Sequence, residues 1–458
     1  MYRVAFRNFA GDRRANVAMI FALCTVPLVF VVGMSIDYGA AARLESKLNA
    51  AADSAVLAAV TPAMMTQPIA TAQAAAAAMF NAEVVGLPRL IYNPANLQIS
   101  IVPVGVARNV TVTYTAQSQN LFGGILNMNT IPLNGSSTAN AATPPNIDFY
   151  LLLDSSPSMA IAGTPADIAT MVSATSSQGG CAFACHEVNP AADNLGNPGG
   201  EDNYALARNL GVTLRTDLLD GAITDLTNTA YSAENNPNVP VEPKYRMAIN
   251  TFDVNFNSGV ALTSNFVSAW ATQLSAMQSN NTQFLEVYDN NNICGSTTTT
   301  TNGVTTTNPC GKGVSNSDAD TNYDTAMSGI TALMPTPGNG TNLAGDTPQE
   351  ILFFVTDGVE DESVNGGRQQ STMTGKQDWC TPLKNKGIKI AVLYTEYFPL
   401  PTNSWYNTYI APIQPSIGTT LQNCASPGLF YEVGLGQNIS SALSQLFQAA
   451  VDSAHLTQ

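Results

Sequence analysis

The length and charge of the chain limit what it can be. At 458 residues it is too long for one ordinary domain, so two or three domains are expected. Charged residues make up 11% of the chain and the net charge is −15, which argues against nucleic-acid binding because such proteins carry basic patches. Four arginines against one aspartate give residues 1–15 a net charge of +3, and 14 basic and 32 acidic residues give the remainder −18.

A membrane-spanning helix is the first predicted element. Residues 15–36 are a run of 22 uncharged residues, which is long enough to cross a bilayer as a helix, and Pro27 within it is tolerated in such helices. Arginines precede the run and Asp37 follows it. The positive-inside rule therefore predicts a cytoplasmic head at residues 1–14 and an extracytoplasmic remainder.

The same segment has a second interpretation, a cleaved signal peptide. Ala40 and Ala42 offer the small residues of a cleavage site. The apolar core of a signal peptide usually has 7–15 residues, and this run is longer. A retained single-pass anchor is the favoured interpretation.

Residues 37–134 are predicted to form helices followed by a small antiparallel sheet. Small and apolar residues recur at helical spacing from Asp37 to Val60, and a second alanine-rich helix follows Pro68. Three runs with strand character come next, at 97–104, 109–117 and 129–137. Residues 135–145 have the composition of a linker.

From Asn146 onward, strand and helix patterns alternate. The expected strands are 147–153, 245–253, 350–357, 388–395 and 429–433, and the expected helices are 203–230, 322–334, 379–387 and 439–454. Repeated βα units predict an α/β fold, a doubly wound and mostly parallel sheet with helices on both faces. Two polar inserts interrupt the alternation, at about 160–202 and 289–320.

Oxygen-bearing side chains gather where two of these strands end. Asp154, Ser156 and Ser158 follow one strand that is apolar almost throughout, and Asp357 ends another. Ligand sites in open α/β sheets lie beyond the carboxyl ends of the strands, so these side chains are expected to lie together. Hard oxygen ligands suit Mg²⁺. The alternative is that they only cap helices and turns.

These residues resemble a known motif. With Thr341 in the glycine-rich loop GNGTNLAG, Asp154-x-Ser156-x-Ser158 and the later Thr-Asp-Gly resemble the metal-ion-dependent adhesion site of von Willebrand factor A domains. The resemblance runs from about residue 146 to 454. It implies that the three hydroxyls bind Mg²⁺ or another divalent cation, that the aspartates act directly or through water, and that an open position accepts an acidic group of a partner.

Two neighbouring residues qualify this motif. Pro157 stands where many members of the family have glycine, which stiffens the loop without removing an oxygen. Asp253 ends another predicted strand and has two interpretations, a position at the same rim and a cap of its own strand end, of which the cap is favoured.

The amino-terminal third resembles a second family. The membrane segment and the stretch DYGAAARLESKLNAAADSAVLAA are similar to TadG-like proteins of the tight-adherence (Tad, Flp pilus) machinery, and the segments GCAFACH, QDWC and NCAS also look like that family. The resemblance implies a bacterial inner-membrane protein of pilus assembly, with a pseudopilin-like segment at 37–134 and most of the chain in the periplasm or outer envelope. Asn16 stands five residues after Gly11, where prepilins carry glutamate, so no prepilin-type cleavage is expected.

Six cysteines follow the predicted span, an even number that favours three disulfides over metal or redox chemistry in an oxidising compartment. Sequence alone allows 15 connectivities. Threonine-rich arms around Asn302-Gly303 predict a hairpin that pairs Thr300 with Val304, a register that places Cys294 opposite Cys310.

The other two pairings have different grounds. Cys181 and Cys185 are paired because they lie close together in sequence; with His186 they also offer a metal-binding alternative. Cys380 with Cys424 follows by elimination and from the TadG resemblance.

Catalysis has little support in the sequence. The chain has two histidines, His186 and His455, and no GxSxG, P-loop or HExxH motif. We expect a membrane-anchored, non-enzymatic component of pilus assembly or anchoring, which binds a protein of the pilus machinery or a pilin through the cation site. The alternative is a surface adhesin that binds a host or matrix ligand through the same site, and homo-oligomerisation is left open.

Overall fold

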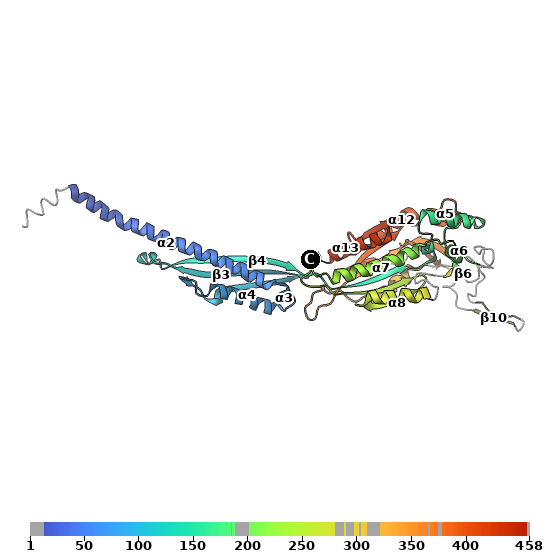
Figure 1. Cartoon of the computed structure of the whole chain (residues 1–458), viewed down its shortest axis with the longest axis horizontal. Coiled ribbons are helices and arrows are strands. Elements are labelled where there is room, and N and C mark those ends of the chain that lie inside the picture. Colours follow the sequence, from blue (N-terminus) through green and yellow to red (C-terminus); the bar gives the residue numbers. More distant parts are fainter. Residues whose placement is uncertain are drawn as a thin grey trace, which may run out of the picture. The chain divides into compact units, whose positions relative to one another are not determined.

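The computed structural model describes residues 13–184, 186–187, 201–279, 288–289, 297–301, 304–308, 321–364, 367–373 and 378–455. The chain divides into two compact units, Met1–Thr143 and Pro144–Gln458 (Figure 1).

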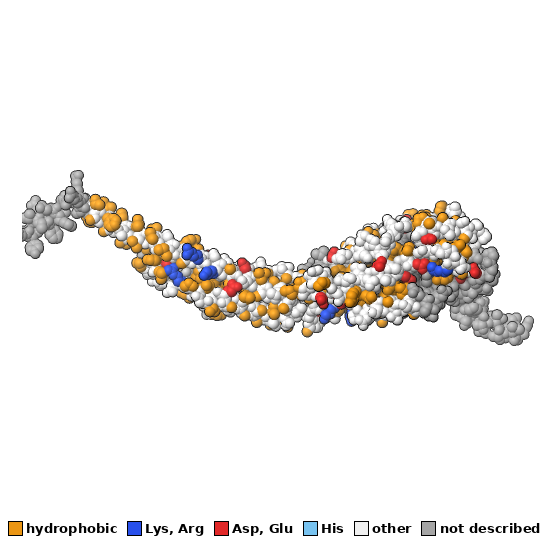
Figure 2. All heavy atoms as spheres, viewed as in Figure 1, with side chains coloured by type: hydrophobic (Ala, Val, Ile, Leu, Met, Phe, Trp, Pro, Cys, Tyr) orange, Lys and Arg blue, Asp and Glu red, His pale blue; other side chains and the backbone are white. Residues whose placement is uncertain are grey.

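The first unit is built on one long helix, α2 (Arg13–Ala59), which contains the predicted span and continues into the alanine-rich stretch. It is long and apolar enough to cross a membrane. Apolar side chains between Val17 and Ile36 are largely exposed, and Figure 2 shows them as a continuous apolar surface along the helix. From Ala41 onward, one face of α2 is buried against the rest of the unit.

Two further helices and a small antiparallel sheet complete this unit. Helix α3 (Pro62–Met65) is one turn long, and α4 (Ile69–Val84) packs on α2. The central strand β3 (Ala107–Gln119) pairs along one edge with β1 (Leu90–Ile91) and β2 (Leu97–Val104), and along the other with β4 (Thr130–Ala142). Short 3₁₀ turns lie at η1 (Pro94–Asn96) and η2 (Gly123–Leu126). Leu48, Phe80 and Tyr114 are fully buried at the centre of its core.

The expected linker is wrong over residues 135–142. These residues form the second half of β4, and they pair with β3 from Gly135 opposite Tyr114 to Ala142 opposite Ala107. Ser137 also donates a hydrogen bond of 2.5 Å to Asp53 of α2. Small polar residues resemble a linker in composition, but backbone pairing along the whole of β3 holds them in a strand.

The second unit contains a six-stranded sheet in the order β16-β15-β12-β5-β7-β8. Neighbouring strands run parallel, except that the edge strand β8 is antiparallel to β7. The strands are β5 (Ile147–Asp154), β7 (Tyr245–Phe252), β8 (Phe256–Thr263), β12 (Gln349–Thr356), β15 (Lys389–Thr395) and β16 (Phe430–Val433). The four central strands are buried on both faces, as helix-covered parallel strands are.

Helices cover both faces of this sheet and enclose two hydrophobic cores. Leu152 and Phe354 face one core, covered by α5 (Pro165–Ala174), α6 (Asn203–Asn209), α9 (Tyr323–Leu333), α10 (Cys380–Asn385), α11 (Ser404–Tyr409) and α12 (Gln414–Cys424). Leu151 and Phe353 face the other, covered by α7 (Arg215–Glu234), α8 (Phe266–Ser279) and α13 (Ile439–His455). The predicted fold class is confirmed.

Some elements of this unit differ from expectation. The single helix expected over 203–230 is two helices, α6 and α7, because Gly211 adopts a left-handed conformation (φ 69°) that ends α6. The sequence analysis does not predict strand β8 or helices α5, α8, α11 and α12, and α5 lies within the first polar insert. Smaller elements are η3 (Pro157–Ala160), η4 (Ser176–Gln178), the paired β6 (His186–Glu187) and β9 (Tyr288–Asp289), and the hairpin of β13 (Val359–Val364) and β14 (Gly367–Thr372).

The threonine-rich hairpin is confirmed, but its predicted register is wrong. Strands β10 (Thr297–Thr301) and β11 (Val304–Asn308) pair with Thr301 opposite Val304, which leaves a two-residue connection, the shortest common hairpin loop. Cys294 and Cys310 lie outside the described residues. The disulfide between them remains a prediction. The observed register does not place the two cysteines opposite each other, so it no longer supports that pairing.

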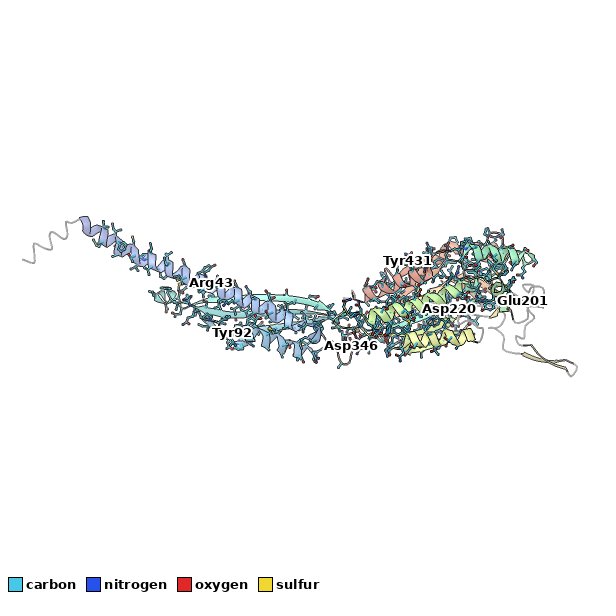
Figure 3. The ribbon with its side chains drawn as sticks, in the orientation of Figure 1. Arg43, Tyr92, Glu201, Asp220, Asp346 and Tyr431 are labelled. Carbon is cyan, nitrogen blue, oxygen red and sulfur yellow. A yellow bond between two sulfur atoms is a disulfide. The ribbon has the colours of Figure 1, made fainter. Side chains whose placement is uncertain are left out.

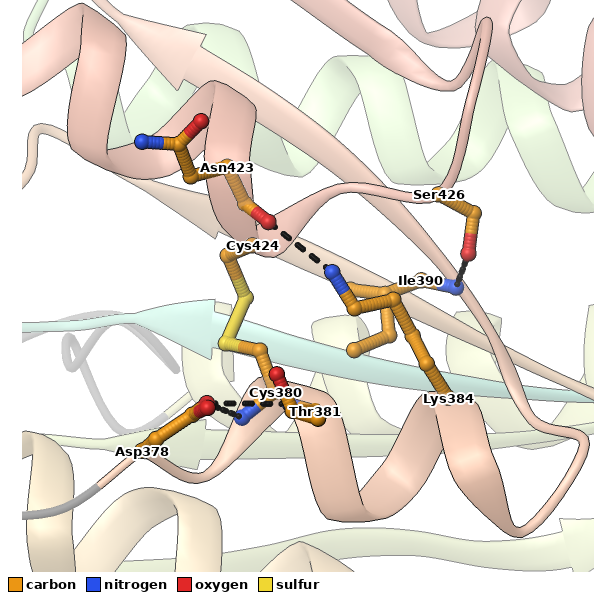
Figure 4. Close-up of a disulfide and its surroundings, with 8 residues drawn as sticks. All are labelled: Asp378, Cys380, Thr381, Lys384, Ile390, Asn423, Cys424 and Ser426. Carbon is orange, nitrogen blue, oxygen red and sulfur yellow. Dashed lines mark hydrogen bonds between the residues drawn. A yellow bond between two sulfur atoms is a disulfide. The ribbon is translucent and has the colours of Figure 1, made fainter.

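The disulfide between Cys380 and Cys424 is present, as expected, and joins α10 to α12 (Figure 4). Lys384 donates to the carbonyl oxygen of Asn423 at 2.9 Å and gives a second link between the two helices. Cys185 lies outside the described residues, so the pairing of Cys181 with Cys185 remains a prediction.

Candidate metal centre

Four of the five predicted ligands lie at the carboxyl edge of the six-stranded sheet. Asp154 is the last residue of β5, and Ser156 and Ser158 follow it in the loop that leads into η3. Asp357 comes directly after β12, the neighbouring parallel strand. Asp154, Ser156 and Asp357 are almost completely buried.

The loop after β5 is held in a fixed conformation by its own hydrogen bonds. The backbone N–H and the hydroxyl of Ser156 donate to Oδ1 of Asp154 at 3.0 and 2.6 Å, and the hydroxyl oxygens of Ser156 and Ser158 are 3.0 Å apart. Ser155 donates twice to the carbonyl oxygen of Phe252, which ties the loop to β7. The two serine hydroxyls are therefore positioned side by side next to a carboxylate.

Thr356 also belongs to this cluster, although the motif did not single it out. Its hydroxyl donates to Oδ2 of Asp154 at 2.6 Å and lies 2.7 Å from the Tyr323 hydroxyl. Both oxygens of Asp154 thus accept hydrogen bonds. The signal was present in the sequence, because Thr356 is the first residue of the Thr-Asp-Gly segment.

Asp357 has an unsatisfied oxygen. Its Oδ1 accepts a hydrogen bond of 3.2 Å from the N–H of Val359, whereas its Oδ2 is buried and has no hydrogen-bond partner among the residues that the structure describes. A buried acceptor without a partner is costly. An added cation or a water bound to one would satisfy this atom.

The electrostatics of the pair also favour a positive charge. Burial, and then the nearby charge of Asp357, raise the pKa of Asp154 to about 7. Burial raises the pKa of Asp357 as well, against the opposing effects of the Ser158 hydroxyl and the Arg215 charge. Arg215 is buried and donates to the carbonyl oxygen of Glu396 at 2.9 Å, and it offsets at most one of the two carboxylate charges.

The assignment of Thr341 to this cluster is wrong. The backbone N–H of Asn146, just before β5, donates to the carbonyl oxygen of Gly340 at 2.7 Å, and its side chain donates to the carbonyl oxygen of Thr341. The Thr341 hydroxyl donates to Asp346 at 2.6 Å, and Figure 3 places Asp346 at one end of this unit. The eight-residue β5 separates Thr341 from Asp154 by roughly 20–25 Å.

Another threonine lies at the correct edge. Thr321 is buried, and its backbone exchanges two hydrogen bonds with that of Asp361, while Asn322 donates to the carbonyl oxygen of Asp253. Tyr323, two residues further on, reaches Asp154 through Thr356. Thr321 is thus a candidate ligand that the sequence reasoning missed.

Asp253 behaves as expected for a residue that caps its own strand. Its side chain accepts hydrogen bonds from the N–H of Asn255 at 2.6 Å and from the side chain of Asn257 at 3.2 Å. Both of its oxygens are used in this turn.

The donor set fits a hard divalent cation. Among the residues that the structure describes, no three His, Cys, Asp or Glu side chains form a metal cluster, so a cation here would depend on hydroxyl oxygens and few carboxylates. Mg²⁺ accepts such sites because it retains several water ligands. Ser156, Ser158 and Asp357 are the residues that would hold it, with Asp154 orienting Ser156.

The amino-terminal region matches a protein-family model. The model, "Putative Flp pilus-assembly TadE/G-like", matches residues 15–79, which contain most of α2, all of α3 and the first two-thirds of α4. The amino-terminal region is TadE/G-like. In the structure, this TadE/G-like region comprises the exposed apolar helix and the helical part of the first unit's core.

Several solved structures are similar to the chain. Their sequence identities to it are low. BatB from Bacteroides thetaiotaomicron is 13% identical, covers 67% of this chain and 100% of its own, and has a TM-score of 0.32. Proximal thread matrix protein 1 from the mussel byssus, with a zinc-occupied MIDAS motif, is 9% identical over 68% of this chain and 49% of its own (TM-score 0.32). The vWF domain of the type V pili tip protein Mfa5 from Porphyromonas gingivalis is 8% identical over 69% and 97% (TM-score 0.32). No curated protein matches the chain.

Proposed function

We propose that this chain is a membrane-anchored, non-enzymatic component of Tad/Flp pilus assembly or anchoring, which binds a protein partner through a divalent cation at the carboxyl edge of its second unit. The observation that carries the pilus assignment is the TadE/G-like match, which falls on a helix long and apolar enough to cross a membrane. The amino terminus would lie in the cytoplasm of a bacterial cell, and both units in the periplasm or outer envelope.

Three features of the edge support a cation. Two serine hydroxyls are 3.0 Å apart and beside a carboxylate, a second buried carboxylate has an oxygen without a partner, and one buried arginine offsets only part of the charge. A bound Mg²⁺ would supply a positive centre with exchangeable positions.

The partner would complete the coordination of that cation. An acidic side chain of a pilus-machinery protein or a pilin is the group that suits an open position on Mg²⁺, because hard cations prefer carboxylate oxygens. Ser158 is the least buried of the predicted ligands at this edge, which makes its side the approach to the cation.

The test is performed in cells that carry the chain and assemble fibres. A photo-crosslinking residue placed at Ala160, close to Ser158 and partly buried, is expected to capture an envelope protein of the pilus machinery, and Ser156→Ala is expected to abolish the capture together with the fibres. Normal fibres with lost binding to host or matrix surfaces would instead identify an adhesin.

A further inference from the structure

The loop between β3 and β4, residues 121–128, lies against α2 inside its apolar segment (Figure 1). Asp37 accepts hydrogen bonds of 2.9, 2.8 and 2.9 Å from the N–H groups of Leu121, Phe122 and Gly123. One helical turn before Asp37, Gly33 is so close to Phe122 that a Cβ at Gly33 would lie 2.7 Å from the Phe122 side chain. The loop is therefore fixed to the helix on both sides of Ile36, the last uncharged residue of the predicted span.

The conformation of the loop is well determined by contacts within it. Asn120 donates from its side chain to the carbonyl oxygen of Met128 at 2.9 Å, and its backbone N–H donates to Asn129. Gly123 has no room for a side chain, because a Cβ there would lie 2.7 Å from the Met128 carbonyl oxygen. Asn127 takes the left-handed conformation that closes the turn.

This closed loop exposes apolar side chains. Ile125 is 76% exposed, Leu121 62% and Met128 49%. On α2, Ile36 and Tyr38 are also exposed at the level where Asp37 holds the loop. Exposed apolar groups gathered in this way mark an interaction surface.

We propose that the loop of residues 121–128 rests in the interfacial layer of the same membrane that α2 crosses, on the side of the first unit. This inference depends on the membrane anchor of the proposed function. Gly33 lies three residues inside the end of the uncharged run, about 5 Å along the helix axis, so Phe122 meets α2 at a depth that belongs to the bilayer. Apolar groups of interfacial segments enter the bilayer by about 5–10 Å.

We assign lipid as the occupant of the exposed apolar side chains of the loop, because they continue the exposed apolar face of the membrane-spanning part of α2. Side chains of α2 before Gly33, such as Val29 and Val32, are exposed and apolar, and they must face hydrocarbon once the helix spans the membrane. The one carboxylate at this level, Asp37, is buried beneath the loop and faces Arg89 at 3.5 Å, so it does not oppose insertion. With two attachments to the bilayer, the height and tilt of the first unit would be fixed relative to the membrane surface.

The experiment uses the full chain in vesicles of phosphatidylcholine and phosphatidylglycerol that carry bromine on their acyl chains, which quenches tryptophan fluorescence at short range. Single tryptophans are introduced as Ile125→Trp, Met128→Trp and Val26→Trp. The matched control is Val102→Trp, at an exposed apolar position of β2. Val102 pairs with Asn109 of β3. Asn109 is ten residues before the end of β3 that enters the loop, a distance of roughly 34 Å along the strand. The native Trp270, Trp379 and Trp405 give a background that is subtracted with the unchanged chain.

We expect the tryptophans of Ile125→Trp and Met128→Trp to be quenched about twofold or more as strongly as the tryptophan of Val102→Trp, because interfacial burial brings them close to the brominated acyl chains. Quenching at 26 without excess quenching at 125 and 128 would overturn the inference and leave the anchor in place. Quenching at none of these positions would contradict both the inference and the anchor.

Discussion

The hydroxyl of Thr356 donates a hydrogen bond of 2.6 Å to Oδ2 of Asp154 and so joins the carboxyl ends of β12 and β5. Tyr323 extends this link to α9, since its hydroxyl lies 2.7 Å from that of Thr356. All three side chains are buried. The carboxylate of Asp154 is therefore oriented by protein groups, and its remaining function is to hold the Ser156 hydroxyl in place.

Thr356→Val is expected to lower the free energy of unfolding by about 1–3 kcal/mol, because it leaves the buried Asp154 oxygen and the Tyr323 hydroxyl without this partner. Urea denaturation followed by tryptophan fluorescence measures it, since all three tryptophans lie in the second unit. Thr229→Val is the control, because it removes a solvent-exposed hydrogen bond to the Asp225 carbonyl oxygen within α7; it is expected to change stability by less than about 0.5 kcal/mol. Equal effects of the two substitutions would contradict the prediction.

Loss of the disulfide between Cys380 and Cys424 is expected to destabilise the second unit. The two residues are 44 apart in sequence, and closing a loop of that size stabilises a protein by about 4 kcal/mol in the chain-entropy model. Cys380→Ser with Cys424→Ser should lower the urea midpoint, whereas the exposed Cys24→Ser should not. An unchanged midpoint in the double variant would show that this link contributes little.

The burial of Glu350 is expected to make the stability of the second unit depend on pH. It is buried at the amino end of β12 near Asp148, which Arg246 contacts through two hydrogen bonds, and its Oε2 has no partner among the described residues. Burial, and then the Asp148 charge, raise the pKa of Glu350 to about 8. The native state thus holds a proton that the unfolded state has released, and stability falls as pH rises from about 4.5 to about 8.

Glu350→Gln should therefore be more stable than the unchanged chain at pH 8 and should lose that advantage near pH 4.5. Urea denaturation at both pH values measures the difference. Glu201→Gln, at an exposed position, is the control and should follow the unchanged chain at each pH. A constant difference between Glu350→Gln and the unchanged chain at both pH values would mean that Glu350 does not titrate in this way.

The sequence predicted the site best where a single apolar run defined a buried strand and also the residue that follows its carboxyl end. The apolar run of β5 predicted a strand buried on both faces, and the same run fixed Asp154 at its carboxyl end. Asp357 followed by the same reasoning from β12. Parallel pairing then brings the two carboxylates to one edge, which the alternation of strands and helices already predicted.

Thr341 was misplaced because chain direction was not considered. Its loop leads into β12, and a loop that leads into a parallel strand lies at the amino edge of the sheet. Thr321 leads into α9, which returns from the carboxyl edge, so the same consideration would have favoured it. The helix expected at 322–334 already placed Thr321 at this edge, but the resemblance to the adhesion-site motif directed the choice to the threonine of the glycine-rich loop.

Residues 135–142 could not be assigned from composition. Serine, threonine, asparagine and alanine give no alternation of apolar and polar side chains, and β4 depends on pairing with β3 and on contacts with α2. These are long-range interactions that a local pattern does not contain.

The central claim is that the carboxyl edge of the second unit binds a divalent cation, and cation-dependent thermal melting tests it most directly. The full chain in detergent is titrated with Mg²⁺, Ca²⁺ and Mn²⁺, beside Ser156→Ala, Asp357→Asn and Thr321→Val at the edge and Thr341→Val at the opposite end. A cation at 100 times its Kd should stabilise the unchanged chain by about 2.7 kcal/mol. We expect this shift to persist in Thr341→Val and to be lost in Ser156→Ala and Asp357→Asn, with Thr321→Val weakened. No cation-dependent shift in the unchanged chain, or its loss in Thr341→Val as in Ser156→Ala, would contradict the account.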